Sequence, residues 1–222
     1  MRVITAAHHV PIPSSRPAPA THAMFGSIEL MGASMHFKKG AEIYGENEPA
    51  DYVYKLVSGT ARSYKILKDG RRQIHGFHFP GDVFGLETGG EHASSAEAMS
   101  DVIVLVVRRS AVLAAATRDS GIARQIWAYT SRELSDARNH AMLLVKTAQE
   151  RVASFLLQLA ARESGDSVEL PMSRQDIADY LGLTIETVSR TLTQFQEDAA
   201  IELPSSRRVV LCNRSALNTL NS

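Results

Sequence analysis

The chain has 222 residues, 44% of them hydrophobic, and its 24 basic side chains balance its 24 acidic ones. This length can fill one large hydrophobic core or two modest ones. The longest apolar run, 102–107, is too short to cross a bilayer, and the beginning of the sequence lacks the apolar run of a secretory signal. A single cysteine, Cys212, excludes an intramolecular disulfide and a cysteine-ligated iron–sulfur cluster or structural zinc site within one chain. We therefore expect a cytoplasmic protein with no membrane contact, no cofactor and no metal ion.

The beginning of the chain and the segment after it differ in character. Residues 1–27 are rich in proline, alanine, serine and histidine without any periodic pattern, which predicts a flexible tail. Residues 28–117 carry short strand patterns separated by glycine turns. Asp69-Gly70 is typical of a type I′ hairpin turn, and the strand 102–107 is apolar enough to be buried on both faces. Strands at this spacing predict a closed, barrel-like antiparallel domain.

A long helix is expected over residues 118–146, after a short alanine-rich helix for which Ser110 is the expected N-cap. One stripe of this long helix repeats at spacings of four and three residues and consists of Trp127, Thr130, Leu134, Ala137, Ala141 and Leu144. A second stripe, formed by Ile122, Ile126 and Tyr129, lies on the neighbouring face. Since the second stripe can pack on the chain's own barrel, the first predicts a homodimer interface. A core helix of a monomer is the alternative.

The C-terminal region, 147–222, begins with a capping-box pattern and then contains the most informative segment of the sequence. Ser173-x-x-Asp176 predicts the capped start of one helix, and Thr184 the N-cap of a second. A small residue where the two helices cross (Ala178), a glycine for the left-handed turn (Gly182) and a β-branched residue in the second helix (Val188) complete the pattern. This combination predicts a helix-turn-helix, which binds DNA through its second helix.

The exposed face at the start of the second helix is expected to enter the major groove. The candidate base contacts are Ile185, Glu186, Thr187, Ser189 and Arg190. Arginine can bond the two acceptors of guanine, and glutamate can accept from a base amino group. A solvent-exposed ion pair between Glu186 and Arg190 is the alternative.

A second set of residues is expected to contact the DNA backbone: Ser173, Arg174, Thr184, Arg207 and Arg208. The last two lie at the tip of a predicted hairpin wing, where solvated turn charges are an equally good interpretation. Overall charge does not favour a nucleic-acid partner, because the segment from residue 171 onward has five arginines, no lysine and six acidic residues. The interpretation therefore depends on where the arginines lie.

The sequence resembles the Crp/Fnr family of bacterial regulators in SRQDIADYLGL and TIETVSRTL, and in YKLVSG, DGRRQIHGFHFPGDVFGLE and AQERVASFL before them. It is most similar to the FixK-type branch, associated with microaerobic, respiratory and nitrogen-fixation genes. The resemblance implies an α+β fold: an N-terminal cyclic-nucleotide-binding-like β-roll, a long dimerisation helix and a C-terminal winged helix-turn-helix. It also implies RNA polymerase as a partner and a palindromic TTG…CAA operator of double-stranded DNA, read by Glu186, Ser189 and Arg190.

The sequence departs from the family's ligand sensors. Nucleotide-binding members have a Glu directly after a Gly and an Arg before Ser-Ala, whereas here Leu86 follows Gly85 and Ser94 precedes Ser-Ala. Residues 91–99 contain no arginine or lysine that can pair with a phosphate. The cysteines of Fnr-type oxygen sensors are absent too. The resemblance therefore implies a transcription activator, not an enzyme, that needs neither a cyclic nucleotide nor an iron–sulfur cluster.

Three alternatives stay open. A regulator of the same fold can be gated by an unidentified ligand or a modification. It can also be gated by haem, for which the candidate ligands are His75, His78, His92 and His140. From a different class, a nucleotide-sensing regulatory subunit would share the β-roll.

Overall fold

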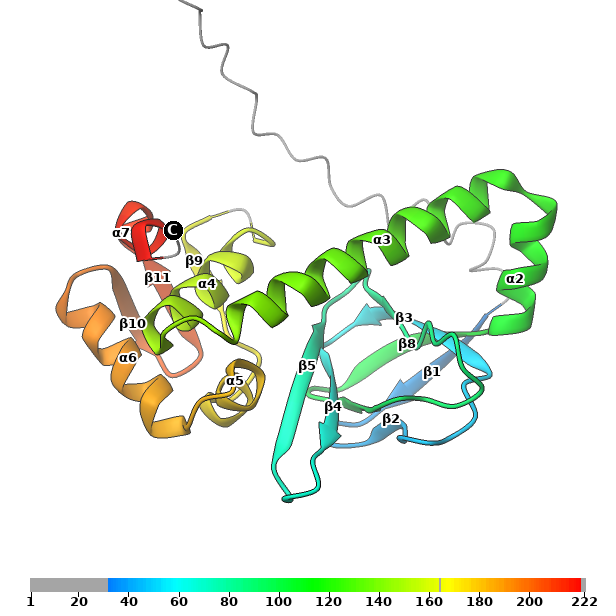
Figure 1. Cartoon of the computed structure of the whole chain (residues 1–222), viewed down its shortest axis with the longest axis horizontal. Helices are drawn as coiled ribbons and strands as arrows, with labels where there is room; N and C mark the ends of the chain where they lie inside the picture. The colour runs from blue at the N-terminus through cyan, green and yellow to red at the C-terminus, as the bar shows by residue number, and fades with distance from the viewer. Residues whose placement is uncertain (1–31, 164, 221–222) are drawn as a thin grey trace, which may run out of the picture.

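The computed structural model describes residues 32–163 and 165–220, so the predicted tail 1–27 lies outside the described residues. The fold is α+β, with an N-terminal β domain, a long helix and a C-terminal helical domain that carries a small sheet (Figure 1). The long helix runs along one side of the β domain and leads into the C-terminal domain.

The N-terminal domain is a roll of two four-stranded antiparallel sheets, with strand orders β1-β8-β3-β6 and β2-β7-β4-β5. The strands are β1 (Ala33–Phe37), β2 (Glu42–Tyr44), β3 (Tyr52–Ser58), β4 (Ala61–Ile66), β5 (Arg72–His78), β6 (Val83–Phe84), β7 (Ser95–Ala98) and β8 (Val102–Arg108). The predicted β-roll is therefore confirmed, and the barrel-like domain expected from the strand spacing consists of two sheets rather than one closed sheet. Strand β8 lies between β1 and β3, and its alternate side chains pack into two hydrophobic clusters, Val102 and Val104 in one and Leu105 and Val107 in the other, which explains its continuous apolar sequence.

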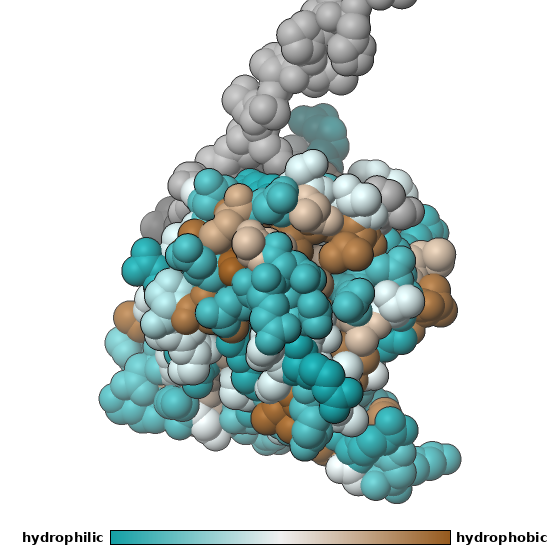
Figure 2. Space-filling view, turned by 90° about the vertical axis from the view of Figure 1, so that its left-hand side faces the viewer, coloured by the Kyte–Doolittle hydropathy of each residue, from teal (hydrophilic) through white to brown (hydrophobic). Residues whose placement is uncertain are grey.

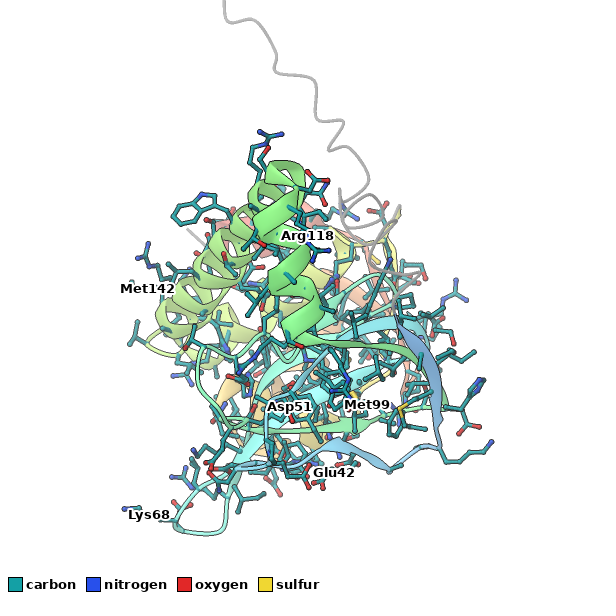
Figure 3. The ribbon with its side chains drawn as sticks, turned by 90° about the vertical axis from the view of Figure 1, so that its right-hand side faces the viewer. Glu42, Asp51, Lys68, Met99, Arg118 and Met142 are labelled. Carbon is teal, nitrogen blue, oxygen red and sulfur yellow. The ribbon has the colours of Figure 1, made fainter. Side chains whose placement is uncertain are left out.

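The hairpin between β4 and β5 forms as predicted, but its turn does not. Leu67 N donates to Arg71 O at 2.8 Å, and Gly70 N donates to Leu67 O at 2.9 Å. Within this loop only Gly70 has a positive φ, 83°, whereas a type I′ turn needs two such residues in succession. The loop is therefore a longer one with a left-handed glycine, and Lys68 lies at its tip, far from the body of the domain (Figure 3).

Two helices follow the roll, α2 (Arg109–Arg118) and α3 (Ser120–Leu143). The predicted N-cap Ser110 is wrong, because the cap of α2 is Arg108, two residues earlier, and it makes no side-chain hydrogen bond. Helix α3 starts after Asp119, whose carboxylate accepts from Gly121 N at 2.7 Å. The predicted inner stripe is confirmed: Ile122 and Tyr129 are buried against the roll, and the Tyr129 hydroxyl donates to Val83 O.

The C-terminal domain contains α4 (Ala148–Ala160), β9 (Ser167–Glu169), α5 (Arg174–Leu181), α6 (Ile185–Glu197), β10 (Ile201–Ser205), β11 (Arg208–Leu211) and α7 (Arg214–Leu220). The wing hairpin β10–β11 forms as predicted, and β9, which the sequence pattern did not indicate, pairs with the outer edge of β11. One core joins α4, α5 and α6 and also takes in Phe77, Phe79 and Met99 from the roll. The two domains are therefore packed together rather than merely linked.

Aromatic rings fill the interior of the roll. The rings of Tyr44 and His92 stack at 3.8 Å between centroids, and those of Tyr54 and Phe84 at 5.5 Å. His78 stacks on Phe84 at 4.5 Å, and its Nε2 lies 2.7 Å from Ser63 Oγ. Burial, helped by the neighbouring charges of His75 and Arg162, lowers the pKa of His78 to about 3.

This packing predicts a pH-dependent stability. The folded pKa of His78 lies below the ordinary histidine pKa of about 6.5, so the unfolded chain takes up the proton first as the pH falls. Its contribution is complete above about pH 6.5 and is lost as the pH falls toward 3. Denaturant titrations should show about 1–2 kcal/mol less stability from this residue at pH 5 than at pH 7. His78→Gln should reduce that difference, and an unchanged pH dependence in the variant would contradict the assignment.

Candidate nucleic-acid interface

Helices α5 and α6 form the predicted helix-turn-helix. Ser173 caps α5 in a capping box with Asp176, and the Thr184 hydroxyl accepts from Thr187 N at the start of α6. Gly182 ends α5 in the left-handed conformation, with φ 62°. Ala178 and Val188, predicted to meet where the helices cross, are both fully buried. All the predicted caps and packing positions of the motif are therefore confirmed.

The start of α6 presents a solvent-exposed face. Ile185, Glu186, Ser189 and Arg190 are exposed on it, while Thr187 is half-buried and shares a 2.9 Å hydrogen bond with Thr184 Oγ1. The alternative ion pair between Glu186 and Arg190 is not formed, and neither side chain bonds to any other described residue. The end of the molecule formed by the C-terminal domain is mainly hydrophilic (Figure 2). These polar groups are therefore available to a partner.

The residues predicted to contact the DNA backbone lie in two different environments. Thr184 and Arg208 are exposed, and Arg208 Nε donates to Ser167 Oγ at 2.8 Å. Ser173 and Arg207 line a hollow of about 170 Å³ where the C-terminal domain meets the roll; Ser173 is half-buried there, whereas Arg207 is exposed and donates through Nη1 to Pro171 O at 2.8 Å. Arg174 is half-buried beside them. Burial, followed by the nearby Arg207 charge, lowers the pKa of Arg174, and Arg174 Nη1 has no hydrogen-bond partner among the described residues.

Helix α5 is held at its N-terminal end by the roll. Arg62 Nη1 donates to Asp176 Oδ1 at 2.5 Å, and Arg72 Nη2 donates to the same oxygen at 2.7 Å. Burial opposes ionisation of Asp176, but the Ser173 N–H and hydroxyl and the two arginines keep its pKa below the ordinary range. Arg72 Nε also donates to Asp179 Oδ2 at 2.8 Å. The sequence indicated only the capping role of Asp176.

The C-terminal end of α5 is held by three further side chains. His140 Nε2 on α3 lies 2.8 Å from Tyr180 O, and the two rings stack at 4.2 Å. Gln73 on β5 donates to the same carbonyl at 3.4 Å, and Arg151 on α4 donates to Leu181 O at 2.9 Å. Carbonyls that a helix end leaves without an intrahelical partner are thus bonded by other elements.

The outer face of α3 carries the predicted dimer stripe. Trp127 is 75% exposed and Leu134 53%, and Thr130, Ala137 and Ala141 are exposed between and beyond them. Leu144 differs, because it is half-buried beyond the end of α3, where a side chain at Gly182 would contact it. Met142, 66% exposed, lies at the outer edge of the molecule near this stripe (Figure 3). Large apolar side chains exposed along one helix are typical of an interaction surface.

Comparison with known proteins decides the family. Two family models match: a cyclic nucleotide-binding domain over residues 34–119 and a Crp-like helix-turn-helix domain over residues 150–220. The nitrogen fixation regulation protein FixK of Azorhizobium caulinodans is 50% identical over 88% of this chain and 82% of its own length. The transcriptional activatory protein AadR of Rhodopseudomonas palustris is 40% identical over 86% and 82%. The chain belongs to the Crp/Fnr family.

A solved structure supports the same assignment. FixK2 from Bradyrhizobium japonicum has a TM-score of 0.83 and 50% identity, covering 86% of this chain and 98% of the FixK2 chain. This Crp/Fnr protein is accordingly a DNA-binding transcription regulator and not an enzyme. No helix among residues 32–163 and 165–220 has the length and apolar character needed to span a membrane.

The residues of this Crp/Fnr protein do not fit a cyclic nucleotide, the ligand that the name of the matched domain implies. Residues 91–99, which include β7, contain no arginine or lysine to pair with a phosphate, and Tyr44, Tyr54 and His92 occupy the interior of the roll. Gly85 approaches Tyr54 so closely that a Cβ would lie 2.7 Å from the ring.

Two of the four histidines considered as haem ligands have hydrogen-bond partners: His78 bonds Ser63 and His140 bonds Tyr180 O. His92 is buried and stacks on Tyr44, with neither ring nitrogen hydrogen-bonded to a described residue, and His75 is exposed. Within the described part of the chain, no three potential metal ligands are grouped so that they could hold an ion.

Proposed function

We propose that this protein is a homodimeric activator that binds palindromic TTG…CAA operators without a cyclic nucleotide or an iron–sulfur cluster. The names of its FixK relatives suggest nitrogen-fixation genes as targets, and we extend this to microaerobic respiratory genes, activated in the cytoplasm by recruiting RNA polymerase. The observation that carries the proposal is the exposed start of α6, where Glu186 and Arg190 have no partner among the described residues.

The chemistry of these side chains supports base recognition. A free guanidinium can donate two hydrogen bonds to one guanine, and a free carboxylate can accept from a base amino group. Phosphates repel Glu186, so a carboxylate at this position favours contact with a base edge rather than with the DNA backbone. Ile185, Thr187 and Ser189 complete the proposed reading surface with apolar and hydroxyl contacts.

The half-buried Arg174 supports a phosphate contact beside the reading surface. Two guanidiniums, those of Arg174 and Arg207, lie close enough for the charge of one to lower the pKa of the other. An anion close to both would offset that repulsion. We propose a DNA phosphate as this anion, held together with Ser173, while Thr184 and Arg208 contact the backbone from the exposed side.

The outer stripe of α3 supports the dimer. Two copies that pair through Trp127, Leu134 and their neighbours would cover apolar side chains that are otherwise in water. A homodimer formed in this way has twofold symmetry, which a palindromic operator matches. We therefore propose that Trp127, Thr130, Leu134, Ala137, Ala141 and Leu144 contribute to the dimer interface.

A mobility-shift titration of the full chain without added ligand tests the proposal. We expect the TTG…CAA palindrome to bind at least 1,000-fold more tightly than a scrambled duplex at the same salt concentration. Cyclic AMP should change the affinity for neither duplex, because side chains fill the interior of the roll and residues 91–99 contain no arginine or lysine. Equal binding to both duplexes would refute the operator. Binding of the palindrome only after cyclic AMP is added would refute ligand independence.

A further inference from the structure

The contact between the roll and α5 combines an apolar centre with a charged edge. Phe77 of β5 lies 5.2 Å from Tyr180 and 6.2 Å from Phe155, measured between ring centroids. At the edge, Arg62 and Arg72 reach across to Asp176 and Asp179 (the carboxylate clamp). Figure 1 shows α5 between the β4–β5 hairpin and α6, so this contact lies directly behind the helix that carries the proposed reading surface.

A further ion pair, between Arg62 and Glu97, supports the carboxylate clamp from within the roll. Arg62 also donates to both carboxylate oxygens of Glu97 on the neighbouring strand, each at 3.0 Å. This contact within the roll orients the Arg62 guanidinium toward Asp176. The side chains of Asp176 and Asp179 are only 8% and 12% exposed, and those of Arg62 and Arg72 are 13% and 24% exposed. Solvent therefore screens these pairs far less than the exposed pairs on the surface.

Such pairs contribute orientation more than stability. Removing two opposite charges from water costs about as much free energy as their attraction returns. The geometry is nevertheless restricted, because Arg72 bonds two carboxylates of α5 at once, Asp179 Oδ2 through Nε and Nη2 and Asp176 Oδ1 through Nη2. The apolar centre holds the domains together, whereas the clamp prevents α5 from sliding or rotating on β5.

We propose that Arg62 and Arg72 are positioning residues for DNA recognition: through Asp176 and Asp179 they lock the helix-turn-helix to the roll in the orientation that binds DNA, without a ligand. This inference rests on the proposed function. A ligand-gated regulator would move its reading helices when the ligand binds, whereas here the lock is permanent and uses only the chain's own side chains. Without these ion pairs, the orientation that binds DNA becomes one of several. The apparent affinity for the operator then falls in proportion to the fraction of molecules in that orientation.

A double-mutant cycle on the full chain tests the clamp. Arg72→Gln and Asp179→Asn should each weaken operator binding about tenfold, because the competent fraction falls to about one tenth. The double variant should bind no more weakly than Arg72→Gln, since Arg72→Gln already removes the ion pair of Asp179 together with the bond from Arg72 to Asp176. Arg71→Gln is the matched control: it removes the same charge one residue away, from a side chain that is 76% exposed and pairs only with Asp69. This control should bind like the wild type.

Spin-label distances test positioning separately from stability, because loss of a merely stabilising contact would leave the distances in the folded protein unchanged. Labels at Lys68 and Gln196, in a Cys212→Ser background and in mixed dimers with unlabelled chain, report the position of α6 relative to the β4–β5 hairpin. We expect one narrow distance without DNA and a broad distribution in Arg72→Gln. Unchanged or tighter operator binding by both single variants, or a distribution as narrow as in the wild type, would overturn the proposal. If the wild type itself fails to bind the palindrome, the proposed function falls, while the label distances still test the clamp.

Discussion

Arg190→Ala should weaken binding to the palindromic operator by about 1–3 kcal/mol, which is roughly a 5- to 150-fold rise in the dissociation constant. The side chain is exposed one helical turn after Glu186 and has no competing partner among the described residues, so its whole hydrogen-bonding capacity is available to a base. The loss should be confined to one base pair. Substituting the contacted guanine should weaken the wild type strongly and the variant little.

Arg214→Ala is the control for this experiment. Arg214 lies in the same domain and carries the same charge, but on α7, where it pairs with Asp166. It should leave discrimination between operator sequences unchanged. If Arg190→Ala weakens operator and scrambled duplex equally, Arg190 is a phosphate contact and its assignment as a base reader is wrong.

Leu134→Asp should convert the protein to a monomer at micromolar concentration and weaken operator binding by at least 100-fold. In the proposed dimer this side chain, 53% exposed in the single chain, is covered by the partner copy, where an unpaired carboxylate is strongly unfavourable. A monomer engages one half-site only and loses the advantage of linking two contacts. Sedimentation velocity measures the first effect, and a mobility-shift titration the second.

Asn139→Asp, on a different face of the same helix, introduces the same charge at an exposed position outside the stripe and should leave the dimer intact. A Leu134→Asp protein that still sediments as a dimer would contradict the proposed interface. Loss of the dimer together with loss of the folded state, detected by circular dichroism, would call for the smaller change Leu134→Ser. That variant should then show weaker dimerisation in a folded chain.

Local patterns predicted the helix-turn-helix well because each of its determinants acts over a few residues. The Ser173 and Thr184 caps reach three residues ahead, and Gly182 adopts its left-handed conformation within one turn. The same local reasoning failed at the start of α2, where the helix begins one residue before the expected cap, directly where β8 ends. It failed again at the β4–β5 turn, where Asp69-Gly70 is part of a longer loop.

The contacts that orient the domains could not be predicted, because they join residues far apart in the chain. Arg62 and Asp176 are separated by 114 positions, and Arg72 and Asp179 by 107. Nothing in the sequence around Arg72 distinguishes it from its exposed neighbour Arg71. Strand β9 was missed for a similar reason: three residues are too few for a periodic pattern, and only their pairing with β11 makes them a strand.

The eight-residue helix α5 shows how closely the two halves of this chain depend on each other. A helix of two turns is not stable alone in water, and here both of its ends are bonded by side chains from the roll, from α3 and from α4. Melting α5 would therefore break bonds in three other elements at once. We therefore expect the first DNA-binding helix and the β domain to unfold together, and a cut between residues 143 and 148 to leave the C-terminal fragment without the contacts from the roll and α3 that hold this helix.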